Sequence, residues 1–137
     1  MDTPREPDDF TRFREWYGLE DAVLVEIERE VVGADFGADG YTTRAQAEAL
    51  GRRLRIGPGN RLLDVGTGRG WPGLYLALTT GCAMVATDVP LEGLRVGVRR
   101  GRRERLGSRA AFLSARAEGL PFRAESFDAV VHTDTLC

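Results

Sequence analysis

The second half of the chain alternates short apolar runs with longer amphipathic segments. Four runs have the length of strands: RLLDVG (61–66), AMVATD (83–88), AAFLS (110–114) and FDAVVHT (127–133). Helical periodicity separates the first three runs, from about Trp71 to Thr80 and from Leu91 to Leu106. Strands that alternate with helices are typical of parallel sheets with right-handed crossovers, so the pattern predicts an α/β fold.

The first half carries two helical patterns. Residues 21–32 repeat apolar side chains at helical spacing, and Thr43 and Gln46 have the spacing of a capping box that begins a second helix. Gly57-Pro58-Gly59 ends that second helix. We expect residues 1–40 to form a helical arm or cap and residues 41–137 to form the core domain. The expected buried faces are Leu24, Ile27 and Val31 in the first helix, and Ala47, Leu50 and Leu54 in the second.

Composition narrows the class of protein. A chain of 137 residues with 42% hydrophobic residues can bury one core. A net charge of -2 argues against nucleic-acid binding, which requires a basic face. No stretch of 18 apolar residues is present and the N-terminus is acidic and polar, so we expect neither a membrane span nor a secretory signal. Cys82 and Cys137 lack metal-ligand spacing, which favours a cytoplasmic protein without disulfides or a metal.

The glycine-rich segment after the first strand is the clearest candidate site. Gly66, Gly68 and Gly70 lie between a predicted strand and a predicted helix, at the sheet edge where open α/β folds bind ligands. Glycines let the backbone approach a ligand, and the helix N-terminus favours an anionic group. Asp88 ends the next strand, 22 positions after Gly66, where an acid can accept hydrogen bonds from a ribose diol. Together these residues predict a nucleoside that carries an anionic group.

Two cofactor classes fit that description. A dinucleotide loop has the spacing G-x-G-x-x-G, but Trp71 stands at the third glycine position here. The carboxylate of Asp64 would repel a pyrophosphate and suits a ligand with an amino group, such as S-adenosylmethionine. A nicotinamide-dependent oxidoreductase is therefore the less favoured of the two hypotheses.

From about Tyr41 to Leu136 the chain resembles the class I S-adenosylmethionine-dependent methyltransferases. LLDVGTGRGWPGLYLA (62–77) resembles the cofactor loop of that family, TDVP (87–90) its ribose-binding strand end, and AEGLPFRAESFDAVVHTD (117–134) its adenine loop and fourth strand. The resemblance implies a Rossmann-like parallel sheet with strand order 3-2-1-4 and flanking helices. It also implies that the methionine part contacts Asp64, Gly66, Thr67, Gly68 and Gly70, the ribose Asp88, the adenine Val89, Ala117 and Glu118, and the sulfonium His132 and Thr133.

The sequence departs from the family pattern in two ways. Arg116 stands where many members have an adenine-binding Asp, and an Arg cannot accept a hydrogen bond. The family fold also has seven strands, whereas this sequence predicts four, so the expected fold is truncated. The fourth strand would then be an exposed edge, which favours association. A truncated gene or product, a split half with a partner chain and a homodimer are all compatible with this pattern.

Several roles stay open. His132 is the candidate catalytic base, but the favoured interpretation is a strand-end side chain that only shapes the pocket. Trp71 fits packing or contact with methionine, Tyr41 fits a helix cap or a lid, and Asp134 fits the site or solvent. We expect methyl transfer to oxygen, nitrogen or carbon of a small-molecule acceptor. The alternative is a fragment that binds the cofactor without turnover. The sequence does not identify the acceptor.

Overall fold

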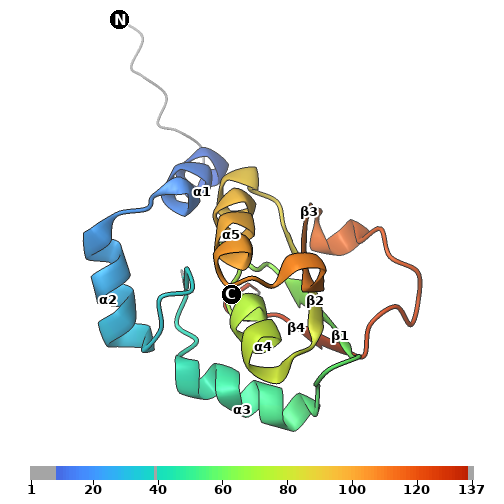
Figure 1. Cartoon of the computed structure of the whole chain (residues 1–137). Helices are drawn as coiled ribbons and strands as arrows, with labels where there is room; N and C mark the ends of the chain where they lie inside the picture. The colour runs from blue at the N-terminus through green and yellow to red at the C-terminus, as the bar shows by residue number, and fades with distance from the viewer. Residues whose placement is uncertain (1–8, 39, 136–137) are drawn as a thin grey trace, which may run out of the picture.

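Four parallel strands form the centre of the fold in the computed structural model, which describes residues 9–38 and 40–135. They are β1 (Arg61–Val65), β2 (Ala83–Asp88), β3 (Ala110–Ser114) and β4 (Ala129–Val131), arranged in the order β3-β2-β1-β4 (Figure 1). In the register, Leu63 of β1 lies opposite Val85 of β2 and Val130 of β4. The predicted α/β class and strand order are therefore confirmed. β4 is shorter than the predicted run 127–133.

The described residues also form five α-helices. Their bounds are α1 (Asp9–Gly18), α2 (Ala22–Val32), α3 (Arg44–Leu54), α4 (Gly73–Thr80) and α5 (Leu91–Arg103), and two short 3₁₀ turns are η1 (Gly107–Arg109) and η2 (Ala117–Gly119). None of the helices within residues 9–38 and 40–135 combines the length and the apolar character needed to cross a membrane. Cys82 is a free, buried cysteine, and Cys137 lies outside the described residues.

The two faces of the sheet are covered unequally. Leu62, Met84 and Ala86 are almost completely buried on one face, where they belong to the same apolar cluster as the α4 side chains Leu74, Leu76 and Ala77. Side chains that alternate along the strands point to the opposite face. On that face Val130 is 54% exposed and Leu113 is 37% exposed. The main apolar cluster of the described structure therefore lies between the sheet and the helices on one side, whereas the opposite face buries Leu63 but leaves Val130 exposed.

The start of α3 has the predicted capping box. Thr43 Oγ1 accepts a hydrogen bond from Gln46 N (3.3 Å), and Gln46 Oε1 accepts one from Thr43 N (2.8 Å). The reciprocal bonds satisfy two donors that a helix N-terminus would otherwise leave unpaired. Ala47 is fully buried, and Leu50 and Leu54 are half-buried, so the predicted inward face of α3 is confirmed.

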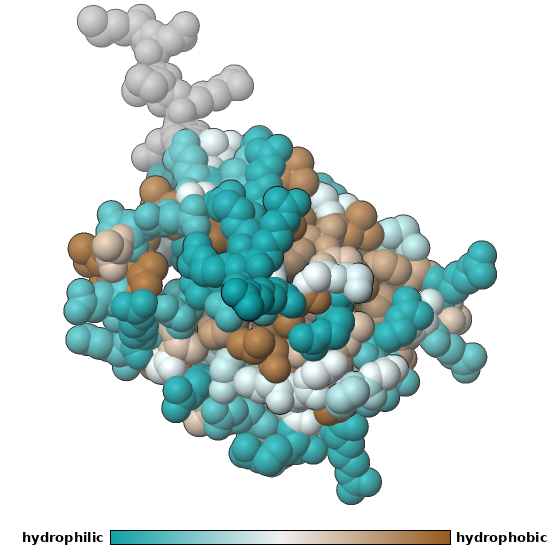
Figure 2. Space-filling model, viewed as in Figure 1, coloured by the Kyte–Doolittle hydropathy of each residue, from teal (hydrophilic) through white to brown (hydrophobic). Residues whose placement is uncertain are grey.

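The predicted buried face of α2 is wrong at Ile27 and Val31, and only Leu24 of the three predicted residues is half-buried. Ile27 is 50% exposed and Val31 is 68% exposed, whereas Glu28 and Val32 are buried. In Figure 2 the exposed apolar residues are visible as brown patches over α2. Glu28 is buried because it forms hydrogen bonds there. Its Oε1 accepts them from two backbone N–H groups of the following loop, at Gly37 (2.9 Å) and Ala38 (3.1 Å). Pairing those donors turns the charged side of the helix toward the body.

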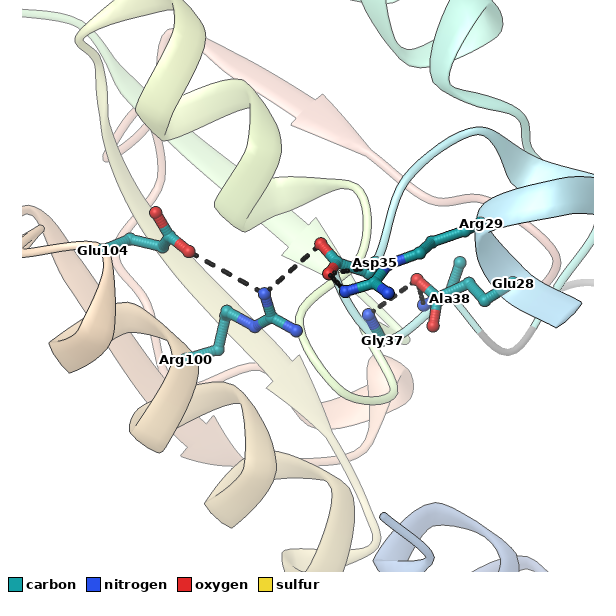
Figure 3. Close-up of polar contacts among 7 residues, drawn as sticks. All are labelled: Glu28, Arg29, Asp35, Gly37, Ala38, Arg100 and Glu104. Carbon is teal, nitrogen blue, oxygen red and sulfur yellow. Dashed lines mark hydrogen bonds and ion pairs between the residues drawn. The ribbon is translucent and has the colours of Figure 1, made fainter. Parts of the chain in front are cut away.

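Ion pairs hold the N-terminal segment against α5. Arg29 of α2 donates to Asp35 (2.8 Å), and Arg100 of α5 lies 3.5 Å from the same carboxylate (Figure 3). The hydrogen bond from Arg29 keeps the pKa of Asp35 below its ordinary value. Arg14 of α1 donates to Glu92 at the start of α5 (2.8 Å). Partly exposed pairs of this kind stabilise a fold weakly. Apolar packing adds to them, because Val32 and Ala34 belong to one buried cluster with Ala47 and Trp71.

Candidate functional site

The loop between β1 and α4 bends sharply at its glycines. Gly66, Gly68 and Gly70 have φ angles of 71°, 59° and 107°, which side chains rarely permit. The N–H groups of Gly66 (2.8 Å) and Thr67 (3.0 Å) both donate to the carbonyl of Thr87 at the end of β2. A Cβ on Gly66 would overlap the side chain of Thr135. The loop is thus confined between β2 and the segment that follows β4.

Asp64, the fourth residue of β1, is completely buried beneath this loop. Its Oδ2 accepts hydrogen bonds from Thr67 Oγ1 (2.7 Å) and from Gly73 N (2.8 Å). Its Oδ1 has no partner among the described residues. Burial disfavours the charged form and raises the pKa of Asp64 to about 7, although the two hydrogen bonds act in the opposite direction. A buried carboxylate oxygen without a donor fits a cationic ligand group such as an ammonium.

Asp88 ends β2 and connects that strand to the glycine loop. Its Oδ2 accepts a hydrogen bond from Gly68 N (2.7 Å), and its Oδ1 accepts one from Val89 N (2.7 Å). Each carboxylate oxygen has two lone pairs, so Asp88 can still accept hydrogen bonds from a ligand. The half-buried position of this carboxylate leaves it reachable from the loop side.

A small cavity of about 40 Å³ lies at the loop. Eight residues line it: Tyr17, Gly40, Gly66, Thr67, Gly68, Trp71, Thr133 and Asp134. The sequence predicts four of them as cofactor contacts, namely Gly66, Thr67, Gly68 and Thr133. Tyr17 and Gly40 were missed because they come from distant segments whose spacing carries no signal. The volume accommodates only a few water molecules, far less than a nucleoside.

Trp71 has the packing role that the sequence leaves open for it, and it also borders the cavity. Its ring packs against Tyr75 and Phe36 with centroid distances of 5.5 Å and 6.3 Å. Its indole N–H donates to the carbonyl of Thr42 (2.9 Å). Packing is therefore observed, and contact with a ligand stays a prediction.

The other predicted site residues lie away from this cavity. Gly70 packs under the loop against Leu74, and Ala117 and Glu118 are exposed in η2. His132 is exposed. The roles of these residues stay predictions. A second cavity of about 290 Å³ lies between α2 and α5. Two of its basic side chains, Arg29 and Arg100, pair there with Asp35.

Comparison with known proteins places these features in a family. Residues 63–137 match the family described as "Methyltransferase domain". The methyltransferase GfsG of Streptomyces halstedii is 39% identical over 83 residues, which are 61% of this chain and 30% of that protein. The ubiquinone/menaquinone biosynthesis C-methyltransferase UbiE of Rhizobium etli is 38% identical over 74 residues, or 53% of this chain and 29% of that protein.

A solved structure has the same fold. The S-adenosylmethionine-dependent methyltransferase of Thiobacillus denitrificans, in complex with S-adenosylhomocysteine, superposes with a TM-score of 0.64 at 22% identity. The match covers 79% of this chain and 43% of that one. The chain thus spans less than a third of the curated relatives and less than half of this structure.

Proposed function

Since the chain belongs to the methyltransferase-domain family, we propose that it binds S-adenosylmethionine at the glycine loop and serves methyl transfer to a small molecule. The observation that carries this proposal is the buried Oδ1 of Asp64 beneath the glycine loop, which has no hydrogen-bond partner among the described residues. Such an oxygen requires a donor, and an ammonium supplies one together with a compensating charge.

The residues around the loop divide the binding between them. Asp64 would bind the amino group of the methionine part, and the loop at Gly66–Gly68 would lie against its backbone. Asp88 would accept hydrogen bonds from the ribose hydroxyls, for which both of its oxygens have lone pairs left. The adenine would be bordered by Val89, Ala117 and Glu118. Because Arg116 cannot accept a hydrogen bond, the adenine amino group would donate to these residues instead.

The bound cofactor supplies a methyl group on a sulfonium, from which the sulfur departs readily. Thr133, which lines the cavity, and His132 beside it would face the acceptor side of this group. The chain's task is to hold the two reactants in line, because alignment provides much of the acceleration in such a displacement. His132 is the candidate base for an acceptor that must lose a proton.

Entry of the cofactor requires the cavity to widen. Tyr17 and Gly40, both from the N-terminal segment, form the side of the cavity that faces the glycine loop. Tyr17 belongs to α1, and the ion pair Arg14–Glu92 that joins α1 to α5 is partly exposed and therefore weak. The proposed arm (residues 1–40) would therefore move relative to the proposed core (41–137) when the cofactor binds.

For the methyl acceptor we propose only a chemical class. The relatives named above include a C-methyltransferase of quinone biosynthesis, which favours a small organic acceptor and leaves oxygen, nitrogen or carbon open. The alternative is binding without turnover. It is favoured by the open sheet face at Val130, which is 54% exposed. On that alternative, a partner chain or second copy would complete the site at the β4 edge.

Calorimetry tests the proposal. We expect S-adenosylmethionine and S-adenosylhomocysteine to bind with dissociation constants in the micromolar range and NAD not to bind. The variant Asp128→Ala should bind like the parent protein, because Asp128 precedes β4, at the end of this strand that lies away from the glycine loop. There Asp128 accepts a hydrogen bond from Arg61 N. Absence of binding in protein shown to be folded by circular dichroism refutes the proposed cofactor. Transfer of an isotope-labelled methyl group to quinone-like and amine acceptors then separates turnover from binding alone.

A further inference from the structure

The carboxylate of Asp134, which follows β4, accepts hydrogen bonds from the segment that precedes α3. Asp134 Oδ2 accepts three hydrogen bonds: from Tyr41 N (3.0 Å), from Thr42 N (3.0 Å) and from Thr42 Oγ1 (2.8 Å). The partners are 92 and 93 residues apart in the chain. Hydrogen bonds to an ionised oxygen are stronger than those between neutral groups. This contact therefore joins the end of the N-terminal segment to the end of β4.

The packing at this contact is close. A Cβ on Gly40 would overlap the carboxylate of Asp134, so this approach needs a glycine. Asp134 itself has a φ of 55°, in the left-handed region that few residues besides Gly, Asn and Asp adopt. Asp is thus one of the few residue types that can adopt this conformation and also present a carboxylate oxygen to the three donors.

A second contact holds the same segment from the other side. The carbonyl of Thr42 accepts the hydrogen bond from Trp71 Nε1, and Trp71 is only 4% exposed at the start of α4. Thr42 is thus bonded through its N–H and hydroxyl to Asp134 and through its carbonyl to Trp71. We refer to these contacts of Gly40–Thr42 with Asp134 and Trp71 as the Asp134 clamp.

The clamp also forms a wall of the cavity at the glycine loop. Gly40, Trp71 and Asp134 line that cavity together with Gly66 and Gly68. We propose that Asp134 is a positioning residue for cofactor binding: its carboxylate holds Gly40–Thr42 as the wall that faces the glycine loop. The inference rests on the proposed cofactor. It assigns Asp134 a function through the backbone that it holds, without contact to the reacting atoms.

The first experiment needs no cofactor. In a Trp16→Phe background, Trp71 is the only tryptophan of the chain and its fluorescence reports on the clamp. We expect Asp134→Ala to shift the Trp71 emission to longer wavelength and to increase its quenching by acrylamide. Asp128→Ala, which removes another exposed carboxylate bonded to backbone, should leave both unchanged. Equal spectra in the two variants would show that the clamp does not hold Trp71.

The second experiment measures affinity for S-adenosylmethionine by calorimetry. We expect Asp134→Ala to raise the dissociation constant by about tenfold, the usual scale for loss of charge-assisted hydrogen bonds. Asp134→Asn should recover most of that loss, because its amide oxygen accepts the same bonds. Gly40→Ala probes the clamp from its other side, since a Cβ there displaces the carboxylate. Gly57→Ala is its control, because a Cβ on Gly57 meets only the Thr80 carbonyl at 3.8 Å.

The outcomes separate the two proposals. If the parent protein does not bind S-adenosylmethionine, the proposed function fails and the positioning role fails with it. If the parent binds and Asp134→Ala, Asp134→Asn and Gly40→Ala bind equally well, only the positioning role of Asp134 is refuted. A larger effect of Asp134→Asn than of Asp134→Ala would also contradict it, because the conservative variant must then be harming something other than the clamp.

Discussion

Asp64 and Asp88 lie on neighbouring parallel strands toward the same edge of the sheet, yet their surroundings differ. Asp64 is fully buried, and one of its oxygens has no donor in the described part of the chain. Asp88 is half-buried, and each of its oxygens accepts a backbone N–H at 2.7 Å. Burial raises the pKa of Asp64 to about 7, because the protein replaces only part of its hydration.

The difference shows that residue type and place on the sheet do not determine the function of an acid. Asp88 has its hydrogen bonds without a ligand, so the fold alone keeps it in place. Asp64 has an incomplete set, and a cationic group would complete it and favour its charged form. The following predictions, from the largest expected effect to the smallest, test whether the two acids differ in this way.

Asp64→Ala should have the largest effect, and it should act on folding. The change leaves the Thr67 hydroxyl and the Gly73 N–H buried without an acceptor. A buried donor left unpaired costs about 1–3 kcal/mol, so we expect the free energy of unfolding to fall by about 3 kcal/mol. Urea denaturation followed by circular dichroism measures this. A loss below about 1 kcal/mol, the level expected for an exposed residue, would mean that these donors find other partners.

Asp88→Ala should instead act on binding. It removes the acceptor proposed for the ribose hydroxyls, and hydrogen bonds to a charged group contribute about 1.5–3 kcal/mol each. We therefore expect the affinity for S-adenosylhomocysteine to fall by about 100-fold, with the urea midpoint changed much less than in Asp64→Ala. Calorimetry on both variants makes the comparison. Similar affinities for Asp88→Ala and the parent protein would remove Asp88 from the site.

The pH dependence of stability should separate the two acids further. The folded-state pKa of Asp64, about 7, lies above its ordinary value of 3.8, so the folded protein binds the proton more tightly than the unfolded chain. The stability that this proton contributes is fully present at low pH and is lost as the pH rises from about 4 through about 7. Between those two values, each tenfold fall in proton concentration lowers the free energy of unfolding by about 1.4 kcal/mol.

Asp64→Asn provides the measurement, since an amide does not ionise. Between pH 5 and pH 8 the free energy of unfolding of the parent should fall relative to that of the variant. Subtracting the two proteins cancels other acids, such as Asp35, whose lowered pKa acts with the opposite sign. A difference that stays constant with pH would place the pKa of Asp64 near its ordinary value.

The sequence predicted the parts of this structure that local chemistry decides. The capping box at Thr43 fixed the start of α3, and the glycines at 66 and 68 fixed the position of the loop, because both depend on neighbouring residues. The buried face of α2 was not predictable from periodicity, since it depends on two N–H groups that pair with Glu28. Tyr17 and Gly40 were likewise missed in the site, because only the tertiary fold brings them to the loop.

Glu118→Gln should have the smallest effect. Glu118 is an exposed residue of η2 without the burial of Asp64 or the backbone bonds of Asp88, and its predicted place at the adenine rests on resemblance alone. Water competes for an exposed carboxylate, so we expect the affinity for S-adenosylhomocysteine to fall by about threefold or less. Glu125→Gln, another exposed acid after η2, is the control in the same calorimetric titration. A loss as large as that of Asp88→Ala would mean that η2 closes over the adenine when the cofactor binds. Glu118 would then be buried by the ligand, whereas Asp64 is buried by the fold itself.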